Sequence, residues 1–323
     1  MKRGLIFALA MVCLVLPLSQ AGALLTGDVN NNQKVEMDDA IIALQAAANL
    51  RVVEGADLGD AVAALQILAG ITQSGGDTVT NALGMTFNRI PAGTFMMGSP
   101  STEPGRDSDE VQHQVTLTND FYMQTTEVTQ GQWQAVMGSN PSYFPACGSN
   151  CPVENVSWYD VQTFITALNA RGEGTYRLPT DAQWEYAARA GSTTAFYNGS
   201  ITNTGTTPLD PNLDAIGWYG GNSAVTYTPN YYGQGTHPVA QKQPNAYGLY
   251  DMSGNVGEWC QDWYQNYSTA SVTNPTGPST GTYRVLRGRA WTSYAADCRS
   301  AFRSEGSPSN RRKHNGFRLL LSP

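Results

Sequence analysis

The sequence Gly-Leu-Tyr-Asp-Met-Ser-Gly-Asn-Val-Gly-Glu-Trp occupies residues 248–259, and it decides the fold expected for most of this 323-residue chain. Two blocks follow it, Arg-Val-Leu-Arg-Gly at 284–288 and Gly-Phe-Arg at 316–318. Two long blocks precede it, at 90–98 and 177–189. So many ordered blocks indicate one specific fold for the whole region that they span.

The residues around these blocks have a mixed local pattern, with short strands, few long helices and many Gly, Asn and Tyr residues. Thr129 and Thr180 are each followed three residues later by glutamine, which makes a capping box at a helix start. Ser157 opens a third helix, whose apolar residues recur at helical spacing. The pattern therefore predicts an α+β domain.

Taken together, the blocks resemble the sulfatase-modifying domain of the formylglycine-generating enzymes, over residues 84–323. The resemblance implies an irregular α+β fold related to C-type lectins, with little regular structure and with bound calcium. We expect this fold here.

Formylglycine-generating enzymes are copper oxidases that convert a sulfatase cysteine to formylglycine, using two cysteines five residues apart. The resemblance places those positions at Ser293 and Cys298. A serine hydroxyl is a poor ligand for Cu(I), which prefers soft thiolates. Gly257 and the block 288–290 also depart from the family's active-site residues. Cys298 remains as a catalytic candidate, but we expect neither copper nor formylglycine formation.

The resemblance also implies calcium sites. One would use the side chains of Asp251 and Glu258 with the backbone carbonyls of Gly254 and Val256, a set of oxygens that suits calcium. In the alternative, these acids pair with nearby arginines. A second site would fall at Asn222 and Ser223, but Tyr231 replaces an aspartate there.

The C-terminal end is rich in arginine. Residues 284–318 contain eight arginines and Lys313, against Asp297 and Glu305. This local excess of positive charge would suit an anion-binding surface. Alternatively, several of the arginines are buried partners of core carboxylates.

Departures from the family pattern concentrate between residues 289 and 315, which resembles the target proteins of diversity-generating retroelements. Those proteins use this fold to display a varied ligand-binding face that ends at Gly-Phe-Arg. Drift in an inactive site would scatter changes in the same way. The residues of the expected face are of the types that paratopes favour; they are Trp291, Ser293, Tyr294, Phe302, Ser309, Asn310, Arg311, Arg312, Lys313 and His314.

The first 23 residues have the order of a secretory signal peptide, with Lys2-Arg3, an apolar run at 5–18 and then small residues. We therefore expect a secreted or periplasmic protein. The apolar run is too short to span a bilayer, so no membrane span is expected.

Residues 24–72 contain a repeat, since the pattern at 36–45 returns at 57–66. They resemble a dockerin, which implies a calcium-binding helical unit and a cohesin-like partner, joined by a linker at 73–83. The alternative is a polar turn before a capped helix. The expected calcium ligands have the spacing of a calcium loop; they are Asp28, Asn30, Asn32, the Lys34 carbonyl and Asp39.

Four cysteines follow the leader, and an even number in an oxidising compartment favours two disulfides. The favoured pairing is Cys147 with Cys151 and Cys260 with Cys298. A four-thiolate zinc site is the alternative.

The formal net charge of -7 argues against nucleic acid as a partner. The function that we expect is a secreted, calcium-binding module for an unknown peptide or glycan. The alternatives are a cysteine oxidase or a related non-haem iron oxidase, and a variable display protein. Iron would need His and carboxylate ligands, and the three histidines are dispersed.

Overall fold

The computed structural model describes residues 78–228 and 233–322. The chain divides into two units, residues 1–76 and 77–323. The expected signal peptide (1–23), the dockerin-like repeat (24–72) and its calcium ligands lie outside the described residues. The strand at 78–80 pairs with the strand at 86–90, so the second unit begins earlier than the boundary at 84 that the sequence suggested.

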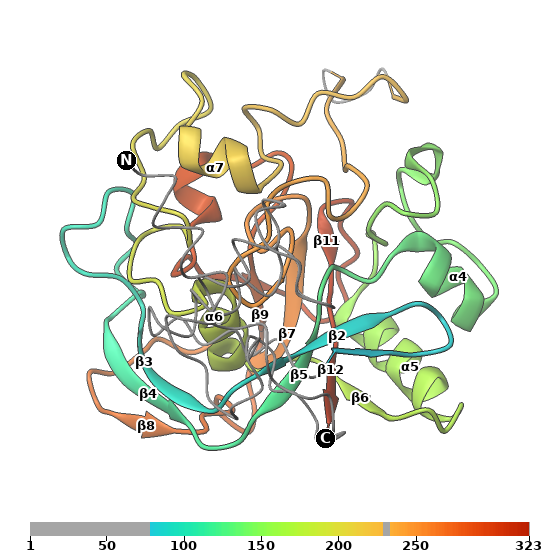
Figure 1. Cartoon of the computed structure of the whole chain (residues 1–323), viewed down its shortest axis with the longest axis horizontal. Helices are drawn as coiled ribbons and strands as arrows, with labels where there is room; N and C mark the ends of the chain where they lie inside the picture. Colours follow the sequence, from blue (N-terminus) through green and yellow to red (C-terminus); the bar gives the residue numbers. More distant parts are fainter. Residues whose placement is uncertain (1–77, 229–232, 323) are drawn as a thin grey trace, which may run out of the picture. The chain divides into compact units, whose positions relative to one another are not determined.

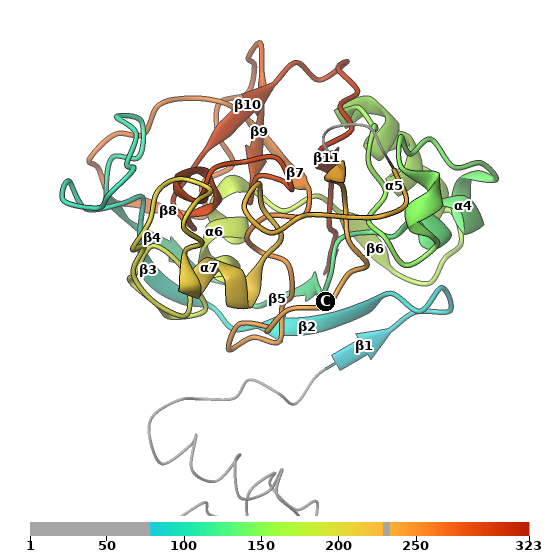
Figure 2. The same cartoon turned by 90° about the horizontal axis from the view of Figure 1, so that it is seen from above.

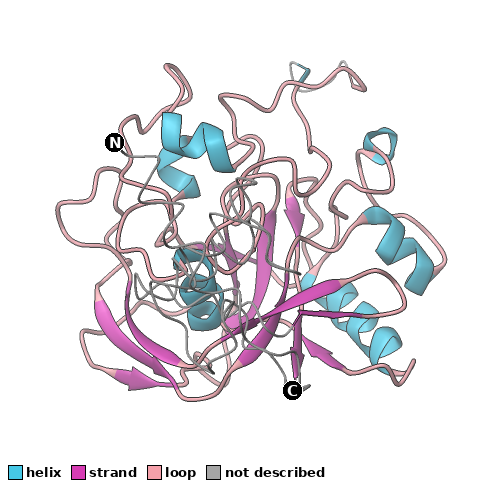
Figure 3. Ribbon diagram, in the orientation of Figure 1, coloured by secondary structure: helices cyan, strands magenta, loops and turns pink. Residues whose placement is uncertain are grey.

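The second unit combines short strands and short helices, which confirms the α+β class (Figures 1 and 3). Its strands are β1 Thr78–Thr80, β2 Thr86–Ile90, β3 Gly93–Met97, β4 His113–Leu117, β5 Phe121–Gln124, β6 Thr175–Arg177, β7 Gly257–Trp263, β8 Val272–Thr273, β9 Arg284–Arg287, β10 Ser304–Gly306, β11 Asn315–Gly316 and β12 Leu320–Ser322. Its helices are α4 Gln130–Met137, α5 Trp158–Asn169, α6 Asp181–Arg189 and α7 Pro211–Ile216, with 3-10 turns η1 Pro145–Cys147 and η3 Ala295–Cys298.

The strands form three small sheets, with the orders β1-β2-β5-β12-β6, β10-β9-β7-β11 and β3-β4-β8. The pairs β7–β11 and β4–β8 are parallel, and the other pairs between described strands are antiparallel. The last strand, β12, lies inside the five-stranded sheet between β5 and β6. Figure 2 shows long loops connecting the sheets, with α4 and α5 together on one side.

The three helices expected from their caps are confirmed. Thr129, Ser157 and Thr180 each accept a hydrogen bond from the third residue of their helix, and each makes a full capping box. Helix α4 ends at Met137, and Gly138 caps it in the left-handed conformation. Helix α7 was not expected, because it lies in a segment rich in Asn, Gly and Thr, where Asp210 caps it.

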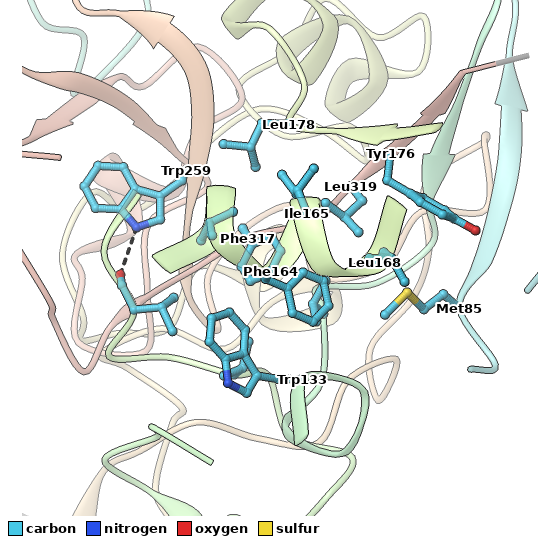
Figure 4. Packing of buried hydrophobic residues seen from close by; sticks show 14 of the residues in the cluster. Met85, Trp133, Phe164, Ile165, Leu168, Tyr176, Leu178, Trp259, Phe317 and Leu319 are labelled. Atoms are coloured by element: carbon cyan, nitrogen blue, oxygen red, sulfur yellow. Dashed lines mark hydrogen bonds between the residues drawn. The ribbon is translucent and has the colours of Figure 1, made fainter. Parts of the chain in front are cut away.

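One core packs between α5 and the five-stranded sheet (Figure 4). Trp133 stacks on Phe164 with their ring centroids 5.0 Å apart, and Phe317 meets both rings edge-on. Trp259 donates its indole N–H to the Val156 carbonyl at 3.0 Å. The Gly-Phe-Arg and Gly-Glu-Trp blocks therefore each contribute one aromatic residue to this core.

Three arginines are completely buried, and each is bound by carboxylates. Arg287 contacts both Asp181 and Glu185, with Nη2 2.7 Å from Glu185 Oε2. Arg318 donates three hydrogen bonds to Glu258. The third is Arg299, which Glu103 and Glu110 bind. For these three arginines, the structure confirms the alternative in which buried arginines pair with core carboxylates.

Replacing Arg318 with alanine should strongly destabilise the protein, because Glu258 would keep a buried charge without a partner. We expect a loss of about 3–5 kcal/mol in the free energy of unfolding. Chemical denaturation measures this loss. The matched control is Arg311→Ala, since Arg311 is 60% exposed and its pair with Asp160 lies at the surface. An equal loss in both variants would contradict the expectation.

Candidate functional site

The chain turns sharply after β9, where Gly288 and Arg289 both have positive φ angles. Beyond this turn, Arg289, Ser293 and His314 line a small pocket of about 160 Å³. Its wall also includes Gly257 from β7. The position that the resemblance gave to a copper ligand therefore does lie at a pocket.

The groups in this pocket have little means of activating a nucleophile. Ser293 is 8% exposed, and its Oγ lies 3.3 Å from the Ala290 amide that donates to it. Burial, and then the positive charges of Arg289, Arg312 and Lys313, lower the pKa of His314 to about 4. The His314 imidazole is therefore neutral at neutral pH.

Cys298 does not line the pocket. Its side chain is fully buried in a hydrophobic cluster with Phe196, Ile216 and Tyr219. Burial raises the pKa of the Cys298 thiol far above its usual range, so the thiolate is disfavoured. The pocket thus has the serine without the cysteine.

The cysteine pairing was predicted half correctly. Cys147 and Cys151 form a disulfide, as expected. Cys260 and Cys298 are both free and buried, so their predicted disulfide is wrong. Cys260 packs in the cluster around Trp184 and Leu320, while Cys298 packs in a different cluster.

The expected ligand-binding face is only partly at the surface. Tyr294 is 62% exposed, and Ser309, Asn310, Arg311 and Arg312 are exposed as well. Lys313 and His314 are half-buried. The structure corrects the expectation for the largest aromatic residues of the face, because Trp291 is 1% exposed and Phe302 is 8% exposed.

Two further tyrosines lie beside this face, and the sequence reasoning missed both. Tyr159 is 54% exposed, and its amide donates to the Pro308 carbonyl. Tyr143 is 45% exposed, and Lys313 Nζ lies 5.8 Å from the centre of its ring. In the sequence, each of these tyrosines stands next to a buried aromatic residue, and this pattern does not by itself indicate an exposed surface. We call Tyr143, Tyr159 and residues 309–313 the outer face.

The expected calcium loop contains one acid that is fully bonded and one that is not. Glu258 accepts from Arg318 and from the Trp184 indole at 2.7 Å. Asp251 accepts one bond, from the Ala240 amide, but its buried Oδ1 has no hydrogen-bond partner. Burial raises the pKa of Asp251 to about 6.

A third acid, Glu127, accompanies this loop. Its side chain is completely buried, and neither carboxylate oxygen has a hydrogen-bond partner. Burial raises the pKa of Glu127 well above its usual range, and the nearby charge of Asp251 raises it further. Buried carboxylate oxygens without partners are costly, so an oxygen-seeking cation would suit Glu127 and Asp251 better than Glu258.

The second expected calcium site has its side chains in use. Asn222 accepts from the Tyr219 amide and donates to Asp214, and Ser223 donates to the Trp291 carbonyl. Tyr231 lies outside the described residues. Within residues 78–228 and 233–322, no three His, Cys, Asp or Glu side chains gather as a group that could hold a metal ion.

A model of the sulfatase-modifying factor enzyme 1-like domain matches residues 77–323. The chain belongs to this family. The family that the sequence blocks indicated is therefore confirmed, as is its mixed helix and sheet architecture.

Two curated relatives of this chain carry different names. The chain is 32% identical to chaperone protein LppX of Paenibacillus barcinonensis, over 72% of this chain and 86% of that protein. It is 34% identical to the formylglycine-generating enzyme of Thermomonospora curvata, over 59% of this chain and 61% of that enzyme. Similarity to an enzyme and to a chaperone leaves the activity to be argued from the site.

Among solved structures, the sulfatase-modifying-type unit is similar to Treponema denticola variable protein 1. The TM-score is 0.65 and the identity 32%, over 76% of this chain and 99% of that one. No helix in the described part of the chain is long and apolar enough to cross a membrane.

We expect the thiols of Cys260 and Cys298 to be free but inaccessible in the folded protein. In a Cys13→Ser background, a thiol reagent such as Ellman's reagent should detect almost no thiol before unfolding. After unfolding in denaturant, it should detect the two free cysteines. Recovery of no thiol after unfolding would show that these cysteines are bonded.

Proposed function

We propose that this protein is a secreted or periplasmic ligand-binding member of its family that lacks cysteine-oxidase activity. The observation that carries the proposal is the difference in surroundings between the two positions that the resemblance assigns to copper. Ser293 lies at the pocket with an oxygen, whereas Cys298 lies within a hydrophobic cluster. A pair of soft ligands for copper is therefore missing.

The outer face is the proposed contact surface for the ligand. Exposed tyrosines provide a large contact area at low conformational cost, and serine and asparagine provide adaptable hydrogen bonds. The Pro308 carbonyl accepts from the Tyr159 amide and the Arg312 carbonyl from the Asn155 amide, while Lys313 lies over the Tyr143 ring. Tyr294 would extend the surface. The ligand class that we propose is a peptide or a glycan.

Similarity to a Treponema protein described as variable supports the alternative that this chain is a variable display protein. The segment from residue 289 to 315, which departs most from the family pattern, would then be diversified between copies of the gene. Structural residues such as Arg299 and Arg303 lie within this segment and are buried, so variation would be limited to the exposed positions.

We also propose that calcium stabilises the unit at residues 251–258. Glu127 and Asp251 would provide the carboxylates, and the Gly254 and Val256 carbonyls would complete the shell. Glu258 would orient the site through Arg318 instead of binding the metal. The support is the set of buried carboxylate oxygens without partners.

Two proposals concern residues 1–72. The dockerin-like repeat would bind a second calcium and attach the protein to a cohesin-like partner. The leader would direct export. Both rest on the sequence pattern alone.

The second candidate function is oxidation of a sulfatase cysteine. The similarity to the Thermomonospora enzyme and the presence of Cys298 favour it. For this activity the protein would need to expose the Cys298 thiol and provide a different second ligand at the position of Ser293.

The ligand-binding proposal predicts specific binding on glycan or peptide arrays. Replacing Tyr159 or Tyr294 with alanine should weaken the detected binding by about tenfold or more, as for aromatic contacts in other interfaces. Tyr283→Ala is the matched control, because Tyr283 is 43% exposed but lies outside the outer face.

The ligand-binding proposal also predicts that the protein does not oxidise a sulfatase-type peptide. With copper, oxygen and a peptide containing Cys-x-Pro-x-Arg, the purified protein should leave the peptide mass unchanged. Formation of an aldehyde, and its loss in Cys298→Ala, would overturn the binding proposal in favour of the oxidase.

The calcium proposal predicts that calcium raises the thermal transition of the 77–323 unit. At free calcium about a hundredfold above the dissociation constant, the gain would be about 2–3 kcal/mol. Glu127→Gln should remove this gain while stabilising the calcium-free protein, because it removes a buried charge. The control Glu305→Gln, at an exposed acid, should keep the gain. A gain unchanged in Glu127→Gln would contradict the proposed ligand.

A further inference from the structure

A cavity of about 460 Å³ lies between the start of α6, the end of β7 and strand β8. It shares no lining residue with the pocket at Ser293. The segment 265–278 forms much of its wall, and β8 in this segment pairs with β4. The cavity and the outer face are therefore formed by different residues.

One lining residue, Asp262, has an oxygen without a partner. Its Oδ2 accepts from the Asp181 amide at 3.0 Å, at the start of α6. Its Oδ1 makes no hydrogen bond or ion pair with the described residues, although the side chain lines the cavity and the residue is only 5% exposed. Oδ1 lies next to Gly277, another lining residue, since a Cβ at Gly277 would be 3.2 Å from it.

The nearby arginines pair with carboxylates other than Asp262, although Arg303 Nη1 makes no hydrogen bond. Arg303, which also lines the cavity, binds Asp181 at 2.9 Å, and Arg287 is shared by Asp181 and Glu185. Among the described residues, no arginine, lysine or histidine forms an ion pair with Asp262. Burial, and then the charge of Asp181, raise the pKa of Asp262 to about 7. The cavity therefore has one carboxylate that lacks a cation.

Apolar and aromatic residues form one part of the cavity wall, beside the polar Gln265, Asn266, Thr273 and Thr276. Met97, Val272, Pro275 and Pro278 line it. Tyr267 and His113 meet edge-on with their ring centroids 4.7 Å apart, and both line the cavity as well. Such a wall favours a ligand with a hydrocarbon stem, because burial of the stem is favourable.

We propose that this cavity binds a primary alkylammonium group, with its nitrogen at Asp262 Oδ1 and its alkyl stem against Met97 and Val272. A lysine side chain and a free diamine have this chemistry in common. A charge-assisted hydrogen bond to a carboxylate in a mostly buried position is among the stronger polar contacts. The site is independent of the proposed outer face and of calcium.

The test is calorimetric titration of the full-length protein with N-acetyl-lysine methylamide and with cadaverine. N-acetyl-norleucine methylamide, which has the stem without the amine, is the matched control. At least one amine should bind, and the norleucine compound should bind about tenfold more weakly or not at all. Binding of the diamine alone would indicate a free amine as ligand, and binding of the lysine compound a protein side chain.

The decisive variant is Asp262→Asn, which can still accept from the Asp181 amide. It should weaken amine binding about tenfold without lowering the thermal transition, because it removes a buried charge next to Asp181. Glu305→Gln removes the same charge at an exposed position and should leave binding unchanged. Ser268→Trp changes an exposed lining residue and should block the cavity, which tests the site if Asp262→Asn does not fold.

Three outcomes would overturn the proposal. The first is equal binding of the lysine and norleucine compounds, and the second is amine binding that survives both Asp262→Asn and Ser268→Trp. Absence of binding by both amines would also overturn it. None of these outcomes affects binding at the outer face, which Tyr159→Ala tests separately.

Discussion

Buried arginine–carboxylate pairs hold this fold together where secondary structure is too sparse to do so. Arg287 ties β9 to the start and middle of α6, Arg318 ties the segment before β12 to β7, and Arg299 reaches the loop at 103–110. Burial makes each pair expensive unless its geometry is complete, so the loops that supply the partners have little freedom to rearrange. Many of the arginines at residues 284–318 are therefore buried and paired with carboxylates. The exposed ones include Arg311 and Arg312.

This rigid frame separates three places with different chemistry. The pocket at Ser293 contains a neutral histidine and no thiol, the loop at 251–258 contains buried acids without partners, and the cavity at Asp262 contains an unpaired carboxylate. The pocket at Ser293 and the cavity at Asp262 share no lining residue, so a change at the first would leave the second intact. The pocket at Ser293 and the 251–258 loop are adjacent, because Gly257 lines that pocket.

Much of the fold could be predicted from local sequence, and much of the site could not. The capping residues Thr129, Ser157 and Thr180 act within one helical turn, so their helices were predictable. The thiols of Cys260 and Cys298 belong to separate hydrophobic clusters, and the loss of their predicted disulfide depends on packing that local sequence does not encode. The same holds for the burial of Trp291 under Phe144 and for the role of Glu127, which lies far in sequence from Asp251. Local patterns predict elements, whereas residues brought together from distant segments need the fold.

Strand β12 has a consequence for how the chain is made. Because Leu320 and Leu321 pair with both β5 and β6, the five-stranded sheet stays open until the residues at 320–322 have left the ribosome. Until then, the core of the domain is incomplete, because it lacks Phe317 and Leu319. Removal of residues 320–322 would therefore damage the domain far more than its length suggests, because β5 and β6 would lose the strand that lies between them.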